Sequence, residues 1–266
     1  MSAQFQLYEG FDTPGTYAND IDITTQSPSG GIGDWVGDWS SVQAGVGGEF
    51  KSVSASMNYT DTSGNILQTT NGSLQRTGGA TTTINRALDQ SLYTSSVPQN
   101  GGTSWFSLIV DVDNTGPSTR FDFNVGDGQN RGPGFVLDSN GVLSARINNA
   151  GFDNTTTLSD GVYFLLGRTT FSISTNPTLD LWINPILDES ELGAASLTVT
   201  GGSFGASETD QVTLRTRNGS IAHVDEIRVA NTFDGVVTVI PEPAYSVVAL
   251  TLITIGGMLI MRRKRN

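Results

Sequence analysis

The chain of 266 residues carries 14 Lys plus Arg, 26 Asp plus Glu, one histidine and no cysteine, so its formal net charge is −12. Four of the basic residues (Arg262, Arg263, Lys264 and Arg265) stand at the C-terminal end, which leaves residues 1–261 still more acidic. This composition excludes disulfides, thiolate chemistry and metal sites built from several Cys or His residues. It also argues against nucleic acid as a partner, because an acidic surface repels phosphates.

Short segments with strand-like alternation, separated by turn residues, run through residues 5–235. The predicted strands are 104–112, 120–125, 142–147, 162–174, 178–183, 196–200, 211–216 and 221–229. In 120–125, for example, Phe121, Phe123 and Val125 face one side and Asp122 and Asn124 the other, as in a half-buried strand. Asn-Gly pairs at 71–72, 100–101, 140–141 and 218–219 mark turns. Helical periodicity is almost absent, so we predict an all-β, antiparallel two-sheet jelly-roll sandwich over residues 1–235.

The same alternation predicts which residues form the core. They are Phe121, Phe123, Phe164, Leu179, Leu181, Ile227 and Val229. Residues 186–195 are expected to form one short helix.

Segment 221–229 cannot be assigned to one phase. If Ile227 and Val229 face inward, a regular strand carries Asp225 and His223 to the same side. Either these two residues lie past the edge of the core, or a bulge resets the phase near Asp225. A buried Asp225 would need backbone amides or an arginine as donors, because an unpaired buried carboxylate is costly. We therefore expect Asp225→Ala to destabilise the fold.

No catalytic motif accompanies these strands, so we expect no catalytic residue and no enzymatic activity. Glycosidases of the laminarinase type on such a sandwich share Glu-x-Asp-x-x-Glu, which is absent here. The run 188–191 reads as a solvated loop or helix, and the adjacent Asp225 and Glu226 point to opposite faces of a strand. His223 lacks a Ser or Cys elbow motif and reads as a strand histidine. A pair of carboxylates from distant strands, as an inverting glycosidase uses, leaves no spacing signal and stays open.

No cofactor is expected, and a metal ion is disfavoured. Asp111 and Asp113 partly match a calcium loop, but the third ligand and the downstream Glu are missing. The next loops contain three further residues that could supply oxygen ligands, namely Asp127, Asn130 and Asp138. Calcium binding by them is as strongly disfavoured as binding by Asp111 and Asp113.

Aromatic rings that stack on sugars are a common device of lectins, and the four tryptophans are candidates for it. Trp35 and Trp39 stand four residues apart in a glycine-rich segment, where such residues more often cap the edge of a sandwich. Trp182 alternates out of phase with Leu181 and is expected on the side opposite the core. Trp105 completes the set, for which a structural role is favoured over carbohydrate contact.

The C-terminal segment predicts a membrane anchor. Residues 244–261 contain no charge, and as a helix they would span roughly 27 Å, close to the ~30 Å hydrocarbon core of a bilayer. The basic tail 262–266 follows at once, which places that end in the cytoplasm and the acidic body outside. The alternative, a buried core helix, is disfavoured because no partner elements surround it.

The linker 236–243 contains Pro241, Glu242 and Pro243 just before the apolar run. The Pro-Glu-Pro triplet, single apolar helix and Arg-rich tail together resemble the PEP-CTERM sorting signal of Gram-negative bacteria. The resemblance implies export, processing of the triplet by an exosortase, and a cell-surface or extracellular location in exopolysaccharide-producing bacteria. Members carry an N-terminal secretory signal, which the first residues here lack. Three explanations stay open: a true start upstream of the recorded one, earlier removal of the signal, and a tail-anchored protein in the cytoplasm.

The body resembles concanavalin-like, LamG-like jelly-roll proteins at three places. These are residues 7–12 with 30–35 and Trp39, residues 179–185, and the closing strand 223–229, where the resemblance implies that the chain returns beside its first strand. The sequence thus predicts an exported, monomeric surface or matrix protein with a non-enzymatic sandwich. A lectin-like module that binds polysaccharide is the alternative, and a glycan hydrolase is the least favoured.

Overall fold

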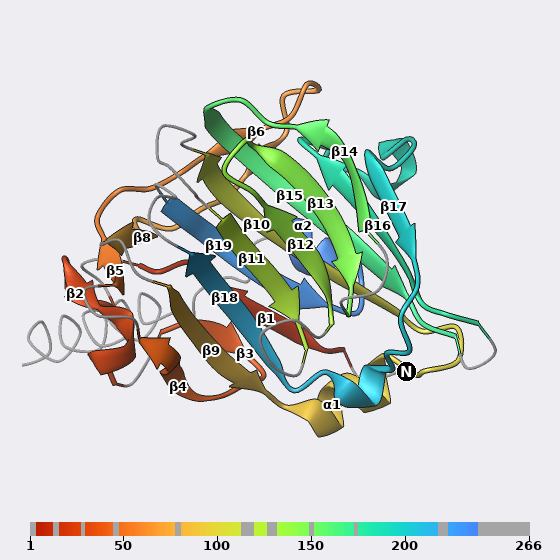
Figure 1. Cartoon of the computed structure of the whole chain (residues 1–266), viewed down its shortest axis with the longest axis horizontal. Coiled ribbons are helices and arrows are strands. Elements are labelled where there is room, and N and C mark those ends of the chain that lie inside the picture. The colour runs from red at the N-terminus through yellow and green to blue at the C-terminus, as the bar shows by residue number, and fades with distance from the viewer. Residues whose placement is uncertain are drawn as a thin grey trace, which may run out of the picture.

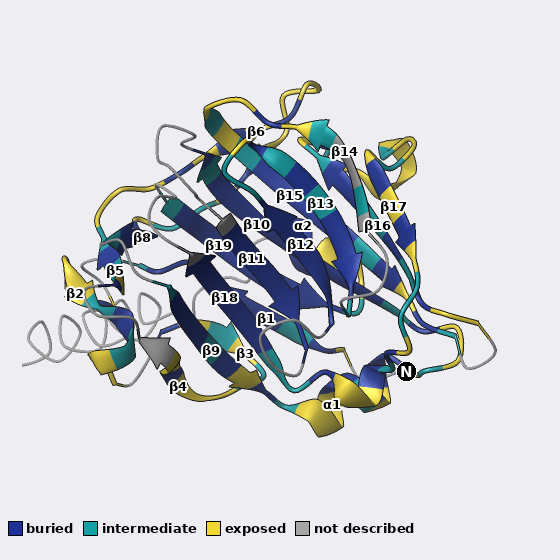
Figure 2. Cartoon of the chain, viewed as in Figure 1, coloured by how far each residue is buried: buried dark blue, intermediate teal, exposed yellow. Residues whose placement is uncertain are grey.

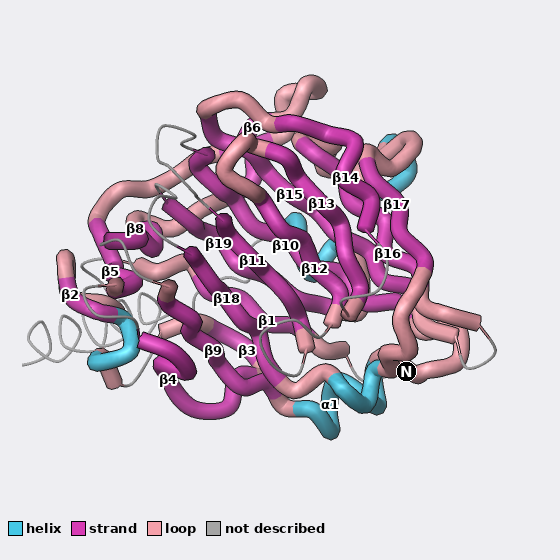
Figure 3. Tube along the Cα trace, in the orientation of Figure 1, coloured by secondary structure: helices cyan, strands magenta, loops and turns pink. Residues whose placement is uncertain are grey.

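The computed structural model describes residues 4–12, 16–27, 30–44, 48–77, 81–112, 120–126, 132–148, 152–172, 175–217 and 223–238. Within these residues two antiparallel sheets lie face to face as the layers of a sandwich (Figure 1). Helical segments are short, and most of the described chain is strand (Figure 3). The prediction of an all-β antiparallel sandwich is confirmed.

The first layer, called sheet 1, has a main path of eight described strands and two strands attached beside it. In spatial order the path is β17 (Leu197–Thr200), β16 (Thr178–Ile183), β15 (Gly161–Thr170), β10 (Thr103–Val112), β19 (His223–Ala230), β8 (Ser73–Thr77), β5 (Glu49–Val53) and β2 (Ile21–Asp22). β1 (Gln6–Glu9) pairs with β19 and with β3 (Ile32–Gly33). The last strand therefore returns beside the first, as expected from the sequence.

The second layer, called sheet 2, has seven described strands. Their order is β14 (Phe152–Thr157), β13 (Val142–Ile147), β12 (Pro133–Leu137), β11 (Arg120–Val125), β18 (Gln211–Arg217), β9 (Thr82–Leu88) and β4 (Trp35–Ala44). The smaller elements are the hairpin β6 (Tyr59–Thr60) and β7 (Ile66–Leu67), helices α1 (Gln90–Ser96) and α2 (Asp234–Val237), and the 3-10 turns η1 (Ile23–Thr25), η2 (Glu189–Glu191) and η3 (Ala206–Glu208).

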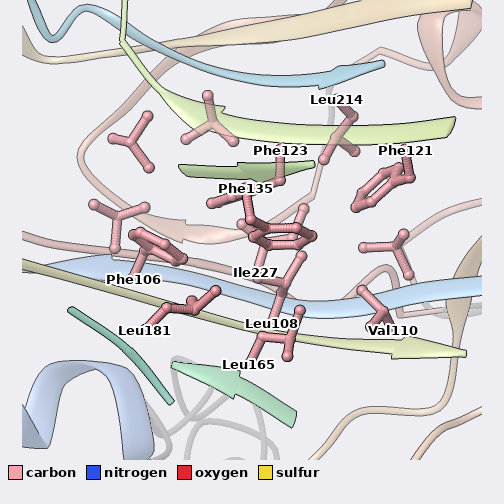
Figure 4. Close-up of a cluster of buried hydrophobic side chains, with 14 of the residues drawn as sticks. Phe106, Leu108, Val110, Phe121, Phe123, Phe135, Leu165, Leu181, Leu214 and Ile227 are labelled. Atoms are coloured by element: carbon pink, nitrogen blue, oxygen red, sulfur yellow. The ribbon is translucent and has the colours of Figure 1, made fainter. Parts of the chain in front are cut away.

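The main core fills the space between the two sheets, with side chains from both inner faces (Figure 4). Phe106 of sheet 1 meets Phe123 of sheet 2 with ring centroids 5.1 Å apart. Gly167 lies opposite Phe106 on the neighbouring strand, and a Cβ there would come within 2.1 Å of the Phe106 ring. A glycine is therefore needed at this position to admit the ring.

A second apolar cluster covers the outer face of sheet 1, beneath the β6–β7 hairpin and α2. Tyr59 of the hairpin stacks on Phe164 of β15 at 4.9 Å, and Val236 of α2 belongs to the same cluster. All seven predicted core residues are buried, and six lie between the sheets, while Phe164 belongs to this second cluster. The central strands of both sheets are buried along their length (Figure 2).

Two helices were expected from the sequence, one over residues 186–195 and one over residues 244–261. The helix expected over residues 186–195 is wrong, because only the three-residue turn η2 forms there, with the Asp188 side chain accepting from the Ser190 amide. A side chain that caps a single turn satisfies the backbone locally and leaves no need for further helical turns. None of the helices described is long and apolar enough to cross a membrane, and residues 244–261 lie outside the described part of the chain.

Candidate functional site

The N-terminal aromatic residues surround a buried ion pair. Glu9 of β1 and Arg86 of β9 are 0% and 5% exposed, and the Arg86 Nη1 donates to Glu9 Oε2 at 2.6 Å, so the pair crosses from sheet 1 to sheet 2. Tyr17 Oη and Trp39 Nε1 donate to the same carboxylate at 2.8 and 3.2 Å. Burial raises the pKa of Glu9, and Arg86 opposes that rise.

Trp35 completes this arrangement from the edge of sheet 2. Its ring lies 4.7 Å from the Arg86 guanidinium, and its Nε1 donates to the Tyr8 carbonyl at 3.1 Å. Trp35 thus packs on the Arg86 side of the ion pair, and Trp39, which is 2% exposed, donates to the Glu9 side. The structure therefore gives both residues a structural role, and carbohydrate contact remains a prediction for them.

Trp105 and Trp182 lie on the outer face of sheet 1, within the second apolar cluster. They are 3% and 5% exposed and stack on each other at 6.0 Å. The Arg168 guanidinium lies 5.5 and 5.2 Å from the two rings and is paired with Asp180 at 2.6 Å. Trp182 thus faces away from the main core, as expected, but its ring is packed by protein and offers little surface to a ligand.

A bulge in β19 resolves the phase conflict found in the sequence. The pairing of β10 with β19 slips between Ser107 and Ile109, and Glu226 adopts a φ of 56°. Asp225, the partner of Ile109, borders the slip and Glu226 lies within it, and both residues are fully buried. The prediction of a bulge near Asp225 is confirmed.

Backbone amides and one arginine satisfy these two carboxylates. Asp225 accepts from the Met57 and Glu226 amides at 3.3 and 2.8 Å. Glu226 accepts from the Thr70 amide at 2.7 Å and from Arg228 Nη2 at 2.6 Å. Burial raises the pKa of both carboxyls. Because Met57 and Thr70 flank the β6–β7 hairpin, the cluster holds that hairpin on sheet 1.

The residues considered for metal binding do not converge in the described part of the chain. Asp111 Oδ2 lies 3.6 Å from His223 Nδ1 across the β10–β19 pair. Asp138 accepts from the Asn140 and Val142 amides and so closes the turn between β12 and β13. Among the residues the structure describes, no group of three His, Asp or Glu is placed to hold a metal ion.

Several predicted residues lie outside the described ranges. They are Asp113, Asp127, Asn130, the Pro241-Glu242-Pro243 triplet and the basic residues Arg262, Arg263, Lys264 and Arg265. Their proposed roles stay predictions.

The outer face of sheet 2 is polar at its centre. Asp122 pairs with Arg215 across β11 and β18, and Asn124 pairs with Thr213 in the next row on the same face. Arg146 of β13 continues that row. These five residues are only 0–9% exposed.

An open cleft lies where three loops meet at one end of the sandwich; we call it the end cleft. Its volume is about 350 Å³. Gln99 enters from the segment after α1, residues 172–177 connect β15 with β16, and residues 203–205 connect β17 with β18. The described lining consists of Gln99, Ser172, Thr175, Asn176, Pro177, Ser203, Phe204 and Gly205.

The lining of the end cleft consists mainly of hydrogen-bonding groups, and its one aromatic residue, Phe204, is only 6% exposed. None of its described side chains is ionisable, and Phe204 is held against Phe171 with ring centroids 6.4 Å apart. Gln99 Nε2 donates to Ser207 Oγ of η3, and Gln90 of α1 donates to the Ser207 carbonyl at 2.5 Å. The amide of Gln99 is therefore positioned by two neighbouring elements.

Sequence reasoning missed the end cleft entirely. Its residues come from three loops separated by about 70 and 30 positions, and each loop has an ordinary turn composition. A binding site of this kind has no spacing motif.

Of the comparisons with known proteins, only that with solved structures found matches. No protein-family model and no curated protein matches the chain. Similar solved structures include an endo-β-1,4-glucuronan lyase from the fungus Trichoderma reesei, with 13% identity, a TM-score of 0.41 and coverage of 86% of this chain and 96% of that one. A GH131 β-glucanase catalytic domain from Podospora anserina has 7% identity, a TM-score of 0.39 and coverage of 75% and 83%. The carbohydrate-binding module CBM66 from Bacillus subtilis has 11% identity and a TM-score of 0.33, with coverage of 73% of this chain and 92% of that one.

These comparisons correct the expectation that the body is not an enzyme. Two of the three structures are enzymes that act on glycans. The absence of Glu-x-Asp-x-x-Glu concerns one kind of active site, and catalytic residues of other kinds can come from distant strands. A missing motif was therefore too narrow a basis for that conclusion.

Proposed function

We propose that the sandwich binds carbohydrate and that the end cleft is its binding site. The observation that carries the proposal is the lining of the cleft, in which the amides of Gln99 and Asn176 stand beside several hydroxyls. Sugars present hydroxyls that both donate and accept hydrogen bonds, and such side chains can pair with them. A volume of about 350 Å³ lies at the lower end of the range for ligand pockets, which suits a short saccharide segment.

Removal of one lining amide tests this proposal. We expect Gln99→Ala and Asn176→Ala each to weaken binding of the saccharides that the wild type selects on a glycan array by about fivefold to tenfold. This corresponds to a lost hydrogen bond of about 1 kcal/mol. Calorimetry on the full chain, in a detergent without a sugar headgroup, measures the affinity.

Asn58→Ala is the matched control. Asn58 is an exposed amide beside the β6–β7 hairpin, where it accepts from Thr69 Oγ1 at 2.8 Å, and it is not among the lining residues of the cleft. Wild-type affinity is expected for this variant. Equal affinities for all three variants, or no glycan bound by the wild type, would refute the proposed site.

The second part of the proposal concerns location. The C-terminal region 236–266, with its triplet, apolar run and basic tail, supports export and display of the sandwich at the cell envelope, with an exosortase as processing partner and exopolysaccharide as the surrounding polymer. This part rests on the sequence.

Replacement of Pro241, Glu242 and Pro243 by alanines tests the sorting proposal. In an exosortase-containing host, the mature wild-type chain is expected to lose its C-terminal segment, whereas the variant keeps it and remains in the membrane fraction. Intact mass of the two mature proteins is the measurement. The same mature mass for both would leave residues 244–261 as an ordinary anchor.

A further inference from the structure

The described lining of the end cleft contains no cation, and a carboxylate is hydrogen-bonded to one of its residues. Glu208 Oε2 accepts from the amide of Gly205, a lining residue, at 2.8 Å. Glu208 belongs to η3, the turn whose Ser207 also holds the amide of Gln99. The one strongly charged group tied to the described lining is therefore negative.

The nearest part of sheet 1 supplies no free positive charge to offset it. Arg168 lies close to the end of β15, the strand that leads into the cleft, but its guanidinium is paired with Asp180 at 2.6 Å. The whole chain adds a net charge of −12. Among the described residues of the lining, a sugar carboxylate would meet no cation, and the Glu208 carboxylate beside them disfavours its binding.

The lack of a side chain at Gly205 makes room for the uncharged amide of Gln99. A Cβ on Gly205 would lie 2.8 Å from Gln99 Nε2, so the absence of a side chain there lets the Gln99 amide rest against the loop. The Gly205 loop thus makes room for the uncharged Gln99 amide, and its own backbone amide donates to the Glu208 carboxylate.

We infer that the end cleft selects uncharged saccharides over acidic ones and that Glu208 is the residue that determines this selectivity. The inference rests on the proposed carbohydrate-binding function. It concerns the chemical class of the ligand, since a neutral hexose chain and its uronate counterpart differ only in the carboxylate.

The experiment compares matched pairs of oligosaccharides on the full chain in a detergent without a sugar headgroup. The probes are β-1,4-linked gluco- and glucurono-oligosaccharides and β-1,4-linked manno- and mannurono-oligosaccharides of equal length. We expect the wild type to bind a neutral member at least tenfold more tightly than its acidic partner at 0.15 M salt. The ratio should shrink in 1 M salt, where the Debye length falls to about 3 Å.

Two variants with the same change in net charge locate the effect. Glu208→Gln keeps an acceptor for the Gly205 amide and removes the charge, so we expect acidic oligosaccharides to gain about threefold or more in affinity while neutral ones stay within twofold. Glu189→Gln in η2, at the opposite end of β16 from the cleft loops, is the control and should change neither.

The outcomes separate the two proposals. If no member of any pair binds, the proposed function fails and this inference with it. If acidic members bind as tightly as neutral ones, carbohydrate binding stands and the inference is overturned. Equal effects of the two Glu→Gln changes would overturn the role of Glu208. Unchanged thermal unfolding of Glu208→Gln shows that the turn is intact.

Discussion

Arg86→Ala is expected to lower the free energy of unfolding by about 3–5 kcal/mol, the largest effect anticipated for a single substitution in this chain. The reason is the position of its partner. Glu9 is fully buried between the sheets, and the variant would leave its carboxylate with the Tyr17 hydroxyl, the Trp39 indole and the Phe11 amide but no cation. A buried charge without a counter-ion is far more costly than an exposed one.

Urea unfolding followed by tryptophan fluorescence measures this effect. Lys51→Ala is the matched control, because Lys51 also pairs with a carboxylate, Asp20 at 3.2 Å, but at an exposed position. We expect little change in its midpoint. If Arg86→Ala is too unstable to purify, the double variant Glu9→Gln/Arg86→Met removes both charges and should recover part of the loss. A midpoint for Arg86→Ala equal to that of Lys51→Ala would contradict a stabilising role for the ion pair.

Asp225→Ala is expected to destabilise the fold by about 1–3 kcal/mol without changing the affinity for any ligand. The variant removes the acceptor of the Met57 and Glu226 amides, both in the buried cluster that holds the β6–β7 hairpin on sheet 1. Chemical unfolding provides the free energy, and the glycan assay provides the affinity. An Asp225→Ala protein that unfolds like the wild type but no longer binds carbohydrate or calcium would instead place Asp225 in a site.

The pH dependence of this effect has a defined sign. Burial, reinforced by the Glu226 charge, raises the pKa of Asp225 well above its ordinary 3.8 in the folded protein. Between the unfolded and folded pKa values the folded state binds more protons, so the contribution of Asp225 to stability falls as the pH rises from about 4 through the folded pKa.

Asp225→Asn should therefore lose less stability than the wild type between pH 4 and 8. The comparison needs the full unfolding curve at each pH, because Glu9 and Glu226, whose pKa values are also raised by burial, contribute in the same direction in both proteins. Parallel pH profiles for the two proteins would show that Asp225 does not titrate between its unfolded value and neutral pH.

The strands in the second half of the chain follow from local pattern. Strands 120–125, 142–147 and 178–183 have the predicted bounds. The first alternates apolar and polar residues without interruption, and the other two keep an apolar inward phase, with Val142 and Trp182 as single apolar residues in the outward phase. Strands near the N-terminus were not predicted, and β1 and β9 show why. In β9 the inward positions are Ile84, Arg86 and Leu88, so a charge interrupts the apolar face. Glu9 does the same in β1.

Taken alone, each of these two strands has a charged residue on its apolar face. The charge is explained only when the two strands are considered together. Arg86 in one sheet and Glu9 in the other satisfy each other across about 77 positions of sequence. Pairing at that separation depends on how the sheets stack, which no local window contains.

The sequence alone predicted the antiparallel sandwich, the inward faces of strands 120–125 and 178–183, the acidic charge of the body and the phase conflict near Asp225, for which a bulge was one of two explanations. These are properties of neighbouring residues, and alternation or charge shows them directly. Only the tertiary structure decided that Trp39, Trp105 and Trp182 are packed inside, and that Gln99 meets residues 175–177 and 203–205 in one cleft. The physical reason is that loops are brought together by the register and stacking of the sheets, and those depend on contacts between residues far apart in the chain.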